Sequence, residues 1–216
     1  MERVIAYVDG YNLYYGLRDR QWKWFYWLNI QLLAWKWFYW LNIQLLAQHL
    51  IKPDQQLVIT KYFTTIVNYP EGRHRRQAIF LEALQTLPDF EIFYGHFLST
   101  QVTCHQCGHT YETHHEKMTD VNIAVELMTD AFQDKFDTAL LIIADSDLVG
   151  PVKAMKRLFE KKRVVVAFPP ARSSAALQRA AHGFYFIGRD KLSKSVFPGE
   201  VVKPDGFTLR RPAEWR

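Results

Sequence analysis

Two kinds of apolar pattern alternate along this chain. Short runs rich in β-branched and aromatic side chains are typical of strands, and they occur at residues 3–8, 57–66, 90–97, 138–144, 164–168 and 184–187. Apolar positions three and four residues apart are typical of helices, and they occur at residues 76–86, 120–133, 151–162 and 174–182. The later strands are continuously apolar, as in a sheet covered on both faces. The alternation predicts a three-layer α/β/α domain with a mostly parallel sheet over residues 1–188.

Two regions lack these patterns. Residues 98–118 carry cysteines and histidines without helical or strand periodicity, so we expect a small Cys/His insert. Residues 189–216 are punctuated by prolines and glycines and are expected to form an extended C-terminal tail. Such a tail is expected to lie over the domain without a core of its own.

A tandem duplication interrupts the first half of the chain. The segment WKWFYWLNIQLLA at residues 22–34 recurs unchanged at residues 35–47, and the two copies contain all but one of the 7 tryptophans. Asn29 or Asn42 is in position to cap the helix IQLLAQHLI. We expect one copy to occupy the native position, while the other protrudes, extends a helix end or pairs with a second chain to give a homo-oligomer. Base stacking by the aromatic side chains is an alternative.

Composition narrows the class of protein. The chain has 216 residues, 49% of them hydrophobic and 23% charged, which is typical of a globular protein and not of a disordered one. No apolar run approaches the roughly 18–20 residues that a membrane span needs. The net charge of +5 favours polyanionic partners. The two cysteines form a CxxC, and no signal-peptide pattern opens the chain, so a cytoplasmic location is expected.

Acidic residues follow several of the predicted elements. Asp9 ends the first strand, with Asn12 three positions later, and Asp145 and Asp147 follow the strand at 138–144. Asp120 begins a helix whose apolar stripe faces the sheet. Because reactive groups gather at the carboxyl ends of parallel strands, these four carboxylates are expected to converge at one sheet edge.

Converging carboxylates repel one another unless a cation neutralises them. Mg²⁺ or Mn²⁺ prefers oxygen ligands, activates water and clamps a phosphodiester for in-line displacement. Lys117 is a candidate to stabilise the departing oxygen in such a reaction. The alternative interpretation is that these acids have structural roles only. In that case Asp145 or Asp147 caps the next helix, Asp9 makes a turn, and Asp120 complements a helix dipole.

Three blocks together resemble the NYN family, a branch of the PIN-like metal-dependent nucleases. They are YVDGYNLYYGL, EKMTDVNIAVELM, and IIADSDLVGPVKAM followed by KRVVVAF, and the likeness spans residues 3–188 apart from the duplication. The resemblance implies a Rossmann-like PIN fold, divalent-metal chemistry and RNA as substrate. It implies that Asp9, Asp120, Asp145 and Asp147 bind Mg²⁺ or Mn²⁺, that Asn12 orients water or the scissile phosphate, and that Ser146 contacts phosphate. Many members have glycine where this chain has Ala144.

The insert suggests a second metal. Cys104 and Cys107 with two of His109, His114 and His115 would suit a structural Zn²⁺. An empty, reduced CxxC and a redox pair are the alternatives, although a redox pair is expected at a helix start.

Basic residues mark candidate RNA contacts. Arg73, Arg75 and Arg76 lie in GRHRR at residues 72–76, which we interpret as a loop after the second strand. Arg172 and Ser173 follow the strand at 164–168 and are candidates for phosphate binding, with an ordinary serine cap as the alternative. The sequence therefore predicts a metal-dependent ribonuclease, with a non-catalytic RNA-binding or scaffold module as the alternative. An aspartyl-phosphate phosphatase needs a carboxylate at position 11, which is Tyr11.

Overall fold

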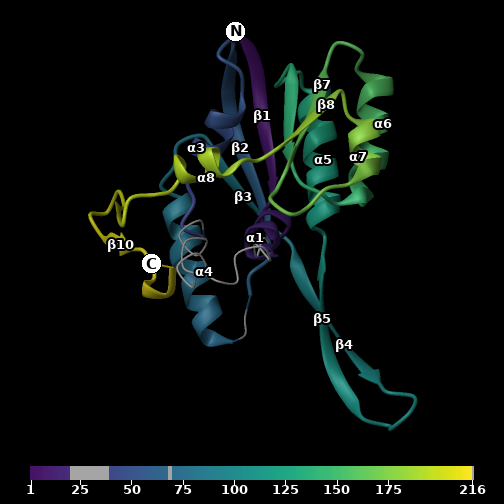
Figure 1. Cartoon of the computed structure of the whole chain (residues 1–216), viewed down its shortest axis with the longest axis vertical. Helices are drawn as coiled ribbons and strands as arrows, with labels where there is room; N and C mark the ends of the chain where they lie inside the picture. Colours follow the sequence, from purple (N-terminus) through teal and green to yellow (C-terminus); the bar gives the residue numbers. More distant parts are fainter. Residues whose placement is uncertain (20–38, 68–69, 216) are drawn as a thin grey trace, which may run out of the picture.

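A six-stranded parallel sheet forms the centre of the molecule (Figure 1). The computed structural model describes residues 1–19, 39–67 and 70–215. The strand order is β3-β2-β1-β6-β7-β8. The strands are β1 (Glu2–Asp9), β2 (Gln55–Thr64), β3 (Phe90–Tyr94), β6 (Thr138–Ile142), β7 (Arg163–Phe168) and β8 (Gly183–Phe186).

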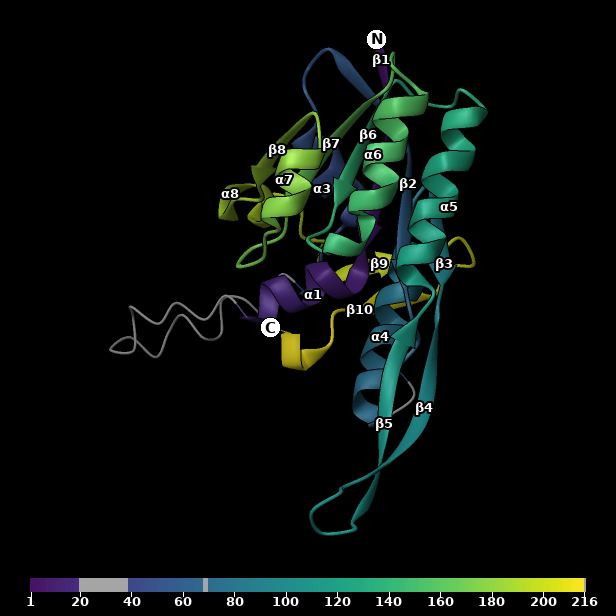
Figure 2. The ribbon, with the colours of Figure 1, turned by 90° about the vertical axis from the view of Figure 1, so that its right-hand side faces the viewer.

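Helices cover both faces of this sheet. Alternate residues of β1 show the two sides: Val4, Ala6 and Val8 belong to one buried cluster, and Ile5 and Tyr7 belong to the other. The first cluster includes residues of α1 (Gly10–Asp19), α3 (Ile43–Leu50), α4 (Glu71–Leu84) and α8 (Arg189–Ser193). The second includes residues of α5 (Thr119–Phe132), α6 (Val149–Leu158) and α7 (Ala175–Ala180), which Figure 2 shows side by side. The predicted three-layer α/β/α architecture is confirmed.

Helix α4 begins earlier than the sequence pattern indicates. It starts at Glu71, so GRHRR at residues 72–76 lies in its first turns and the prediction of a loop there is wrong. Pro70 stands at the N-cap, and Glu71 places a negative charge in the first turn, which favours a helix start. No large apolar residue occurs between Glu71 and Arg76, so the apolar spacing alone could not reveal this turn.

The Cys/His insert is a β-hairpin. Strands β4 (His96–Thr103) and β5 (Thr110–Lys117) pair antiparallel and project from the body (Figure 1). The predicted strand at 90–97 divides at Gly95, where a Cβ would lie 2.6 Å from the Lys117 carbonyl oxygen and 2.7 Å from Thr65 Oγ1. Glycine at this position therefore allows the base of the hairpin to pack against the sheet edge.

The C-terminal segment lies over the domain, as predicted, but it is not simply extended. It contains α8, the antiparallel strands β9 (Glu200–Val202) and β10 (Thr208–Arg210), and a short 3-10 helix, Ala213–Trp215. Leu192, Phe197 and Leu209 are buried in the cluster that includes α3 and α4. The tail therefore completes one face of the core.

The end of the second copy of the duplication occupies a core position. Trp40 is fully buried, and its Nε1 donates a hydrogen bond of 2.6 Å to the carbonyl oxygen of Pro198. Asn42 caps α3 by accepting from the Leu45 N–H at 2.8 Å. The first copy, including Asn29, lies outside the described residues. The pairing of one copy with a second chain stays a prediction. Among the helices that are described, none has the length and apolarity needed to cross a membrane.

Candidate active site

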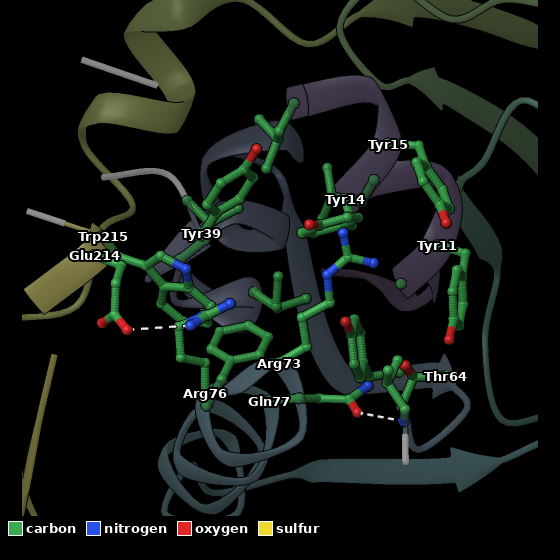
Figure 3. Close-up of a pocket in the computed structure, with 18 residues that line it drawn as sticks. Tyr11, Tyr14, Tyr15, Tyr39, Thr64, Arg73, Arg76, Gln77, Glu214 and Trp215 are labelled. Atoms are coloured by element: carbon green, nitrogen blue, oxygen red, sulfur yellow. Dashed lines mark hydrogen bonds and ion pairs between the residues drawn. The ribbon is translucent and has the colours of Figure 1, made fainter. Parts of the chain in front are cut away.

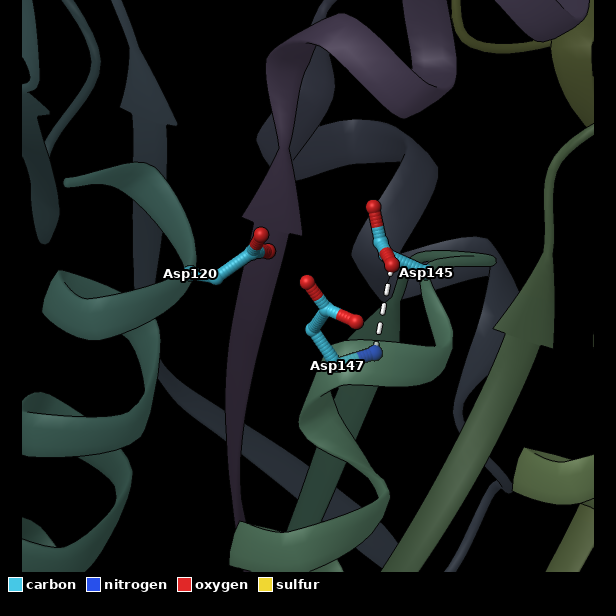
Figure 4. A group of neighbouring side chains, drawn as sticks. All are labelled: Asp120, Asp145 and Asp147. Atoms are coloured by element: carbon cyan, nitrogen blue, oxygen red, sulfur yellow. Dashed lines mark hydrogen bonds between the residues drawn. The ribbon is translucent and has the colours of Figure 1, made fainter. Parts of the chain in front are cut away.

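Three carboxylates meet at the carboxyl edge of the sheet. One carboxylate oxygen from each of Asp120, Asp145 and Asp147 lies within 4.8 Å of the others. Figure 4 shows Asp120 reaching across from α5 toward Asp147 and Asp145. Asp120 and Asp145 are partly buried, whereas Asp147 is exposed. The predicted convergence therefore holds for these three residues.

The local backbone structure positions each of these three aspartates. Asp145 follows β6 and caps the 3-10 helix Ser146–Leu148, because its Oδ1 accepts from the Asp147 N–H at 3.2 Å. Leu148 is buried and anchors this turn. On the other side, Met118 has φ of 79° and turns the chain from β5 into α5, which brings Asp120 into the first turn. Asp145 is thus both a helix cap and a member of the carboxylate group.

Asp9 is not part of this group among the described residues. It ends β1 and is 3% exposed, and the register that pairs Val8 with Ile142 places it at the same sheet edge. Its oxygens accept from the Asn12 N–H at 2.9 Å and from Asn12 Nδ2 at 2.5 Å. Helix α1 begins at the very next residue, Gly10, so the Asp9 carboxylate accepts hydrogen bonds from Asn12 in the first turn of this helix. The predicted set of four convergent aspartates is therefore reduced to three.

The first turn of α1 packs closely on β2. A Cβ on Gly10 would lie 2.4 Å from the Tyr62 hydroxyl oxygen, so glycine is required for this approach. Burial, and then the negative charge of Asp9, raise the pKa of the Tyr62 hydroxyl. The Asp9 carboxylate is therefore held near a phenol that stays neutral.

An open cleft of about 440 Å³ contains two of the three acids. Its lining includes Asp120, Asp147 and Lys117, which is the last residue of β5. Ser146 is exposed on the turn between Asp145 and Asp147 and is not part of this lining. The cleft therefore places two carboxylates and one lysine side chain around the same open space.

The donor chemistry of the three acids fits a hard divalent cation. Carboxylate oxygens that converge this closely repel one another without a counter-charge. Mg²⁺ and Mn²⁺ take oxygen ligands and keep several waters, so three carboxylates in an open cleft suit them. The cleft lining contains no thiol or imidazole, the groups that zinc prefers.

A second cavity of about 400 Å³ lies on the other side of β1, between α1, α4 and the C-terminal segment. Figure 3 shows Arg73 pointing into a ring of aromatic side chains. The aromatic side chains of its lining are Tyr11, Tyr14, Tyr15, Tyr39, Tyr62, Phe80 and Trp215. This aromatic pocket was not predicted from the sequence, although the spacing of Tyr11, Tyr14 and Tyr15 puts them on one helix face.

Hydrogen bonds and an ion pair fix the wall of the aromatic pocket that α4 provides. Gln77 accepts from the Val67 N–H at 2.7 Å and donates to the Thr65 carbonyl oxygen at 2.8 Å. Arg76 forms a 3.1 Å ion pair with Glu214. The pocket is therefore held in shape by groups from α4, from the end of β2 and from the tail.

The basic residues that were predicted to contact RNA lie partly in the aromatic pocket and partly outside it. Arg73 and Arg76 line the aromatic pocket, whereas Arg75 is exposed outside its lining. The Arg172 guanidinium lies 5.5 Å from the centroid of the Tyr15 ring. Ser173 is exposed, and the neighbouring Ser174 caps α7 by accepting from the Leu177 N–H at 3.4 Å, which is the ordinary capping role.

The cysteines lie at the far end of the hairpin. Cys104 and Cys107 are free thiols, and hydrogen bonds from the backbone N–H groups of Cys107 and Gln106, then the Cys107 side chain, lower the pKa of Cys104. The strand register pairs His114 with Ser99 and His115 with Leu98, well back along the ribbon. A zinc site built from both cysteines and two of His109, His114 and His115 needs at least one of these distant residues. The register therefore excludes the predicted zinc site within one chain.

Comparisons with known proteins identify the family. The family model for the NYN domain matches residues 3–188. A crystal structure of a protein of unknown function from Vibrio parahaemolyticus is similar at 19% sequence identity and a TM-score of 0.54. The similarity covers 91% of this chain and 96% of that one, which shows a shared fold. No curated protein matches the sequence. With its parallel PIN-like sheet and acidic edge, this chain belongs to the NYN domain family.

Proposed function

We propose that this protein is a ribonuclease that hydrolyses RNA phosphodiester bonds with the help of Mg²⁺ or Mn²⁺. The observation that carries the proposal is the group formed by Asp120, Asp145 and Asp147 at the carboxyl edge of the sheet. Membership of the NYN family, whose fold is that of PIN-like nucleases, supports the same assignment. A divalent ion held by these carboxylates supplies Lewis-acid chemistry and a nucleophilic water for phosphodiester cleavage.

The chain's own residues have distinct tasks in this proposal. Asp120 and Asp147 reach the cleft from opposite walls, and Asp145 holds the turn that presents Asp147. Lys117 lines the same cleft and is in position to balance negative charge on the phosphate and on the departing oxygen. Ser146 is an exposed hydroxyl between two of the acids and is a candidate phosphate contact.

Asp9 and Asn12 are proposed as positioning residues. The Asp9 carboxylate adds a fourth negative charge at the same edge, and two hydrogen bonds from Asn12 fix its orientation. Because Asn12 is committed to Asp9, it is expected to act on the substrate through that carboxylate and not by direct contact. Replacing Asn12 should therefore change the metal dependence of cleavage more than the affinity for RNA.

We propose that the aromatic pocket binds RNA bases beside the cleft. Stacking on aromatic rings is favourable for every base and is typical of proteins that hold single strands. Arg73 offers a guanidinium among those rings for a backbone phosphate. The net charge of +5 favours the same class of partner. Single-stranded RNA is therefore the expected substrate form.

A cleavage assay tests the proposal. End-labelled single-stranded and hairpin RNA, the corresponding DNA and a small phosphomonoester are incubated with the protein in Mg²⁺, Mn²⁺ or EDTA. Metal-dependent cleavage of RNA is expected, with loss of cleavage in Asp147→Asn. Asp54→Asn, an exposed aspartate outside the cleft lining, is the matched control and should cleave normally. Equal cleavage by Asp147→Asn would show that a contaminant or another site cuts the RNA.

A non-catalytic RNA-binding module is the second candidate. The observation that favours it is that the aromatic pocket and the carboxylate cleft have no lining residue in common. RNA held in the aromatic pocket would therefore not require a metal ion in the cleft. RNA binding that is unchanged by EDTA, together with no cleavage in either metal, would support this candidate over the nuclease.

A further inference from the structure

The tip of the β4–β5 hairpin has an ordered turn that presents two sulfur atoms to solvent. The Gly108 N–H donates to the Cys104 carbonyl oxygen at 2.8 Å, and the Cys104 N–H donates to the His109 carbonyl oxygen at 2.8 Å. Gly108 has φ of 70°, which closes the turn without the steric cost that a side chain would bring. Cys104 is partly exposed, and Cys107 is exposed.

The turn brings both free cysteines to the far end of the hairpin, between the end of β4 and the start of β5. Two thiolates presented from one turn are half of a tetrahedral zinc site.

Among the described residues, no further pair of ligands lies beside these two cysteines. Among the described residues, the group of metal-binding side chains with three or more members is the aspartate group, and neither cysteine belongs to it. His114 lies opposite Ser99, five residues back from Cys104, which is about 16 Å of strand. Bonds from zinc to sulfur and nitrogen are only about 2.0–2.3 Å long, so one ion cannot join these residues.

We propose that a Zn²⁺ ion joins two copies of this chain tip to tip, held by Cys104 and Cys107 of each copy. A two-fold arrangement doubles the two thiolates to the four that a closed structural site requires. The hairpin projects from the body, so the tips can meet without contact between the domains (Figures 1 and 2).

The charge of the hairpin allows this approach. Residues 96–111 contain no aspartate, glutamate, lysine or arginine, although the whole chain carries +5. Two tips of this composition meet without like-charge repulsion at neutral pH. The four thiolates and the zinc ion then leave a net charge of about −2 at the junction of the two tips.

The test measures zinc content and mass of the full chain, purified without a histidine tag and kept reduced. We expect about one zinc ion per two chains. Light scattering should give a mass twice 25.5 kDa with zinc, falling to the monomer after chelation. Cobalt substitution should give the intense visible absorption and charge-transfer bands of a tetrahedral thiolate site.

Matched variants separate the proposed site from its alternatives. Cys104→Ser and Cys107→Ser should each lose zinc and the zinc-dependent dimer, while His114→Ala and His115→Ala keep both. Asp147→Asn should dimerise normally, so failure of the nuclease proposal does not affect this result. A monomer with about one zinc per chain would overturn the proposal. So would a mass that zinc leaves unchanged, or a dimer that only a reductant dissociates.

Discussion

At the scale of single residues, the proposed metal site predicts that the carboxylate group affects stability in opposite ways with and without a cation. Asp120, Asp145 and Asp147 lie close enough to repel one another when no cation is present, and a bound divalent ion would neutralise this repulsion. We predict that Asp147→Asn does not lower the thermal unfolding midpoint in EDTA, because one of three like charges is removed. Mg²⁺ or Mn²⁺ should raise the midpoint of the native protein and leave the variant nearly unchanged, since binding to the folded state stabilises it. Calorimetry in both buffers gives the comparison, and an equal metal-induced rise in the variant would contradict it.

Arg73 and Arg75 provide a matched pair on the first turns of α4. Both are exposed, but Arg73 lines the aromatic pocket and Arg75 does not. We predict that Arg73→Ala weakens binding of single-stranded RNA and lowers the slope of log affinity against log salt by about one. Arg75→Ala should change both quantities less. Fluorescence anisotropy at several salt concentrations measures the difference, and identical slopes for the two variants would rule out a specific phosphate contact at Arg73.

The residues of the site could be predicted only in part. Asp120, Asp145 and Asp147 follow from the rule that strand ends gather reactive groups, because each adjoins a strand or helix end. The pairing of Asp9 with Asn12 depends on α1 starting directly after β1, which the sequence pattern did not specify. The ion pairs of the buried Lys61 with the buried Asp130 at 2.6 Å and with the partly buried Glu126 at 2.7 Å were also missed. A lysine within a strand gives no sign of partners on a distant helix.

At the scale of elements, the junction of β5 and α5 is under backbone strain. Met118 adopts φ of 79°, a left-handed conformation that costs an L-residue roughly 1–2 kcal/mol. We predict that Met118→Gly raises the free energy of unfolding, by up to about 1 kcal/mol after the greater flexibility of the unfolded chain is counted. Met118→Ala is the control, because it keeps the Cβ and should bring no such gain. Urea unfolding measures both, and an equal gain in the two variants would mean that the methionine side chain, and not the backbone, is responsible.

The elements that could be predicted are those with a buried face. Strands β1, β6 and β7 and helix α5 have apolar residues in the expected period, so their existence and approximate bounds were clear. The β4–β5 hairpin projects from the body (Figure 1), and the residues of β4 are exposed except for the partly buried Phe97 and Val102. Its sequence therefore has no strict apolar alternation to detect. The first turns of α4 were missed for a similar reason, since Gly72 to Arg75 are exposed.

At the scale of the whole molecule, an ion pair ties β1 to the segment that precedes β6. The Arg3 N–H donates to Asp137 Oδ2 at 2.7 Å, and an Arg3 guanidinium nitrogen lies 2.8 Å from Asp137 Oδ1. Hydrogen bonds from the Arg3 side chain, then from its backbone N–H, lower the pKa of Asp137 to about 2. This carboxylate therefore stabilises the fold at and above its ordinary pKa.

The lowered pKa predicts an acid-sensitive contribution to stability. Because the folded value is below the unfolded one, stability should fall as pH decreases from about 4 toward about 2. The effect should be small, since the two side chains are 39% and 41% exposed. Asp137→Asn should lower stability at pH 6 and flatten this part of the profile. Urea midpoints at pH 6, 4, 3 and 2 measure it, and parallel profiles for the two proteins would contradict the assignment.

The molecule as a whole depends on its C-terminal segment and on one copy of the duplication. Trp40 packs 5.6 Å from Phe197 and 6.5 Å from Trp215, measured between ring centroids. The tail and the described end of the second copy, from Tyr39 onward, therefore complete the core together with α4. Proline and glycine spacing indicated a tail over the domain but could not show these contacts, because they join residues far apart in the sequence.

The central claim is that Asp120, Asp145 and Asp147 hold a divalent cation. Diffraction from crystals soaked in Mn²⁺, recorded to reveal the anomalous signal of manganese, tests it most directly. We predict an anomalous peak between the three carboxylates, at slightly more than about 2.1 Å from their oxygens. Well-ordered carboxylates with no anomalous peak between them, at a manganese concentration that supports RNA cleavage, would contradict the account.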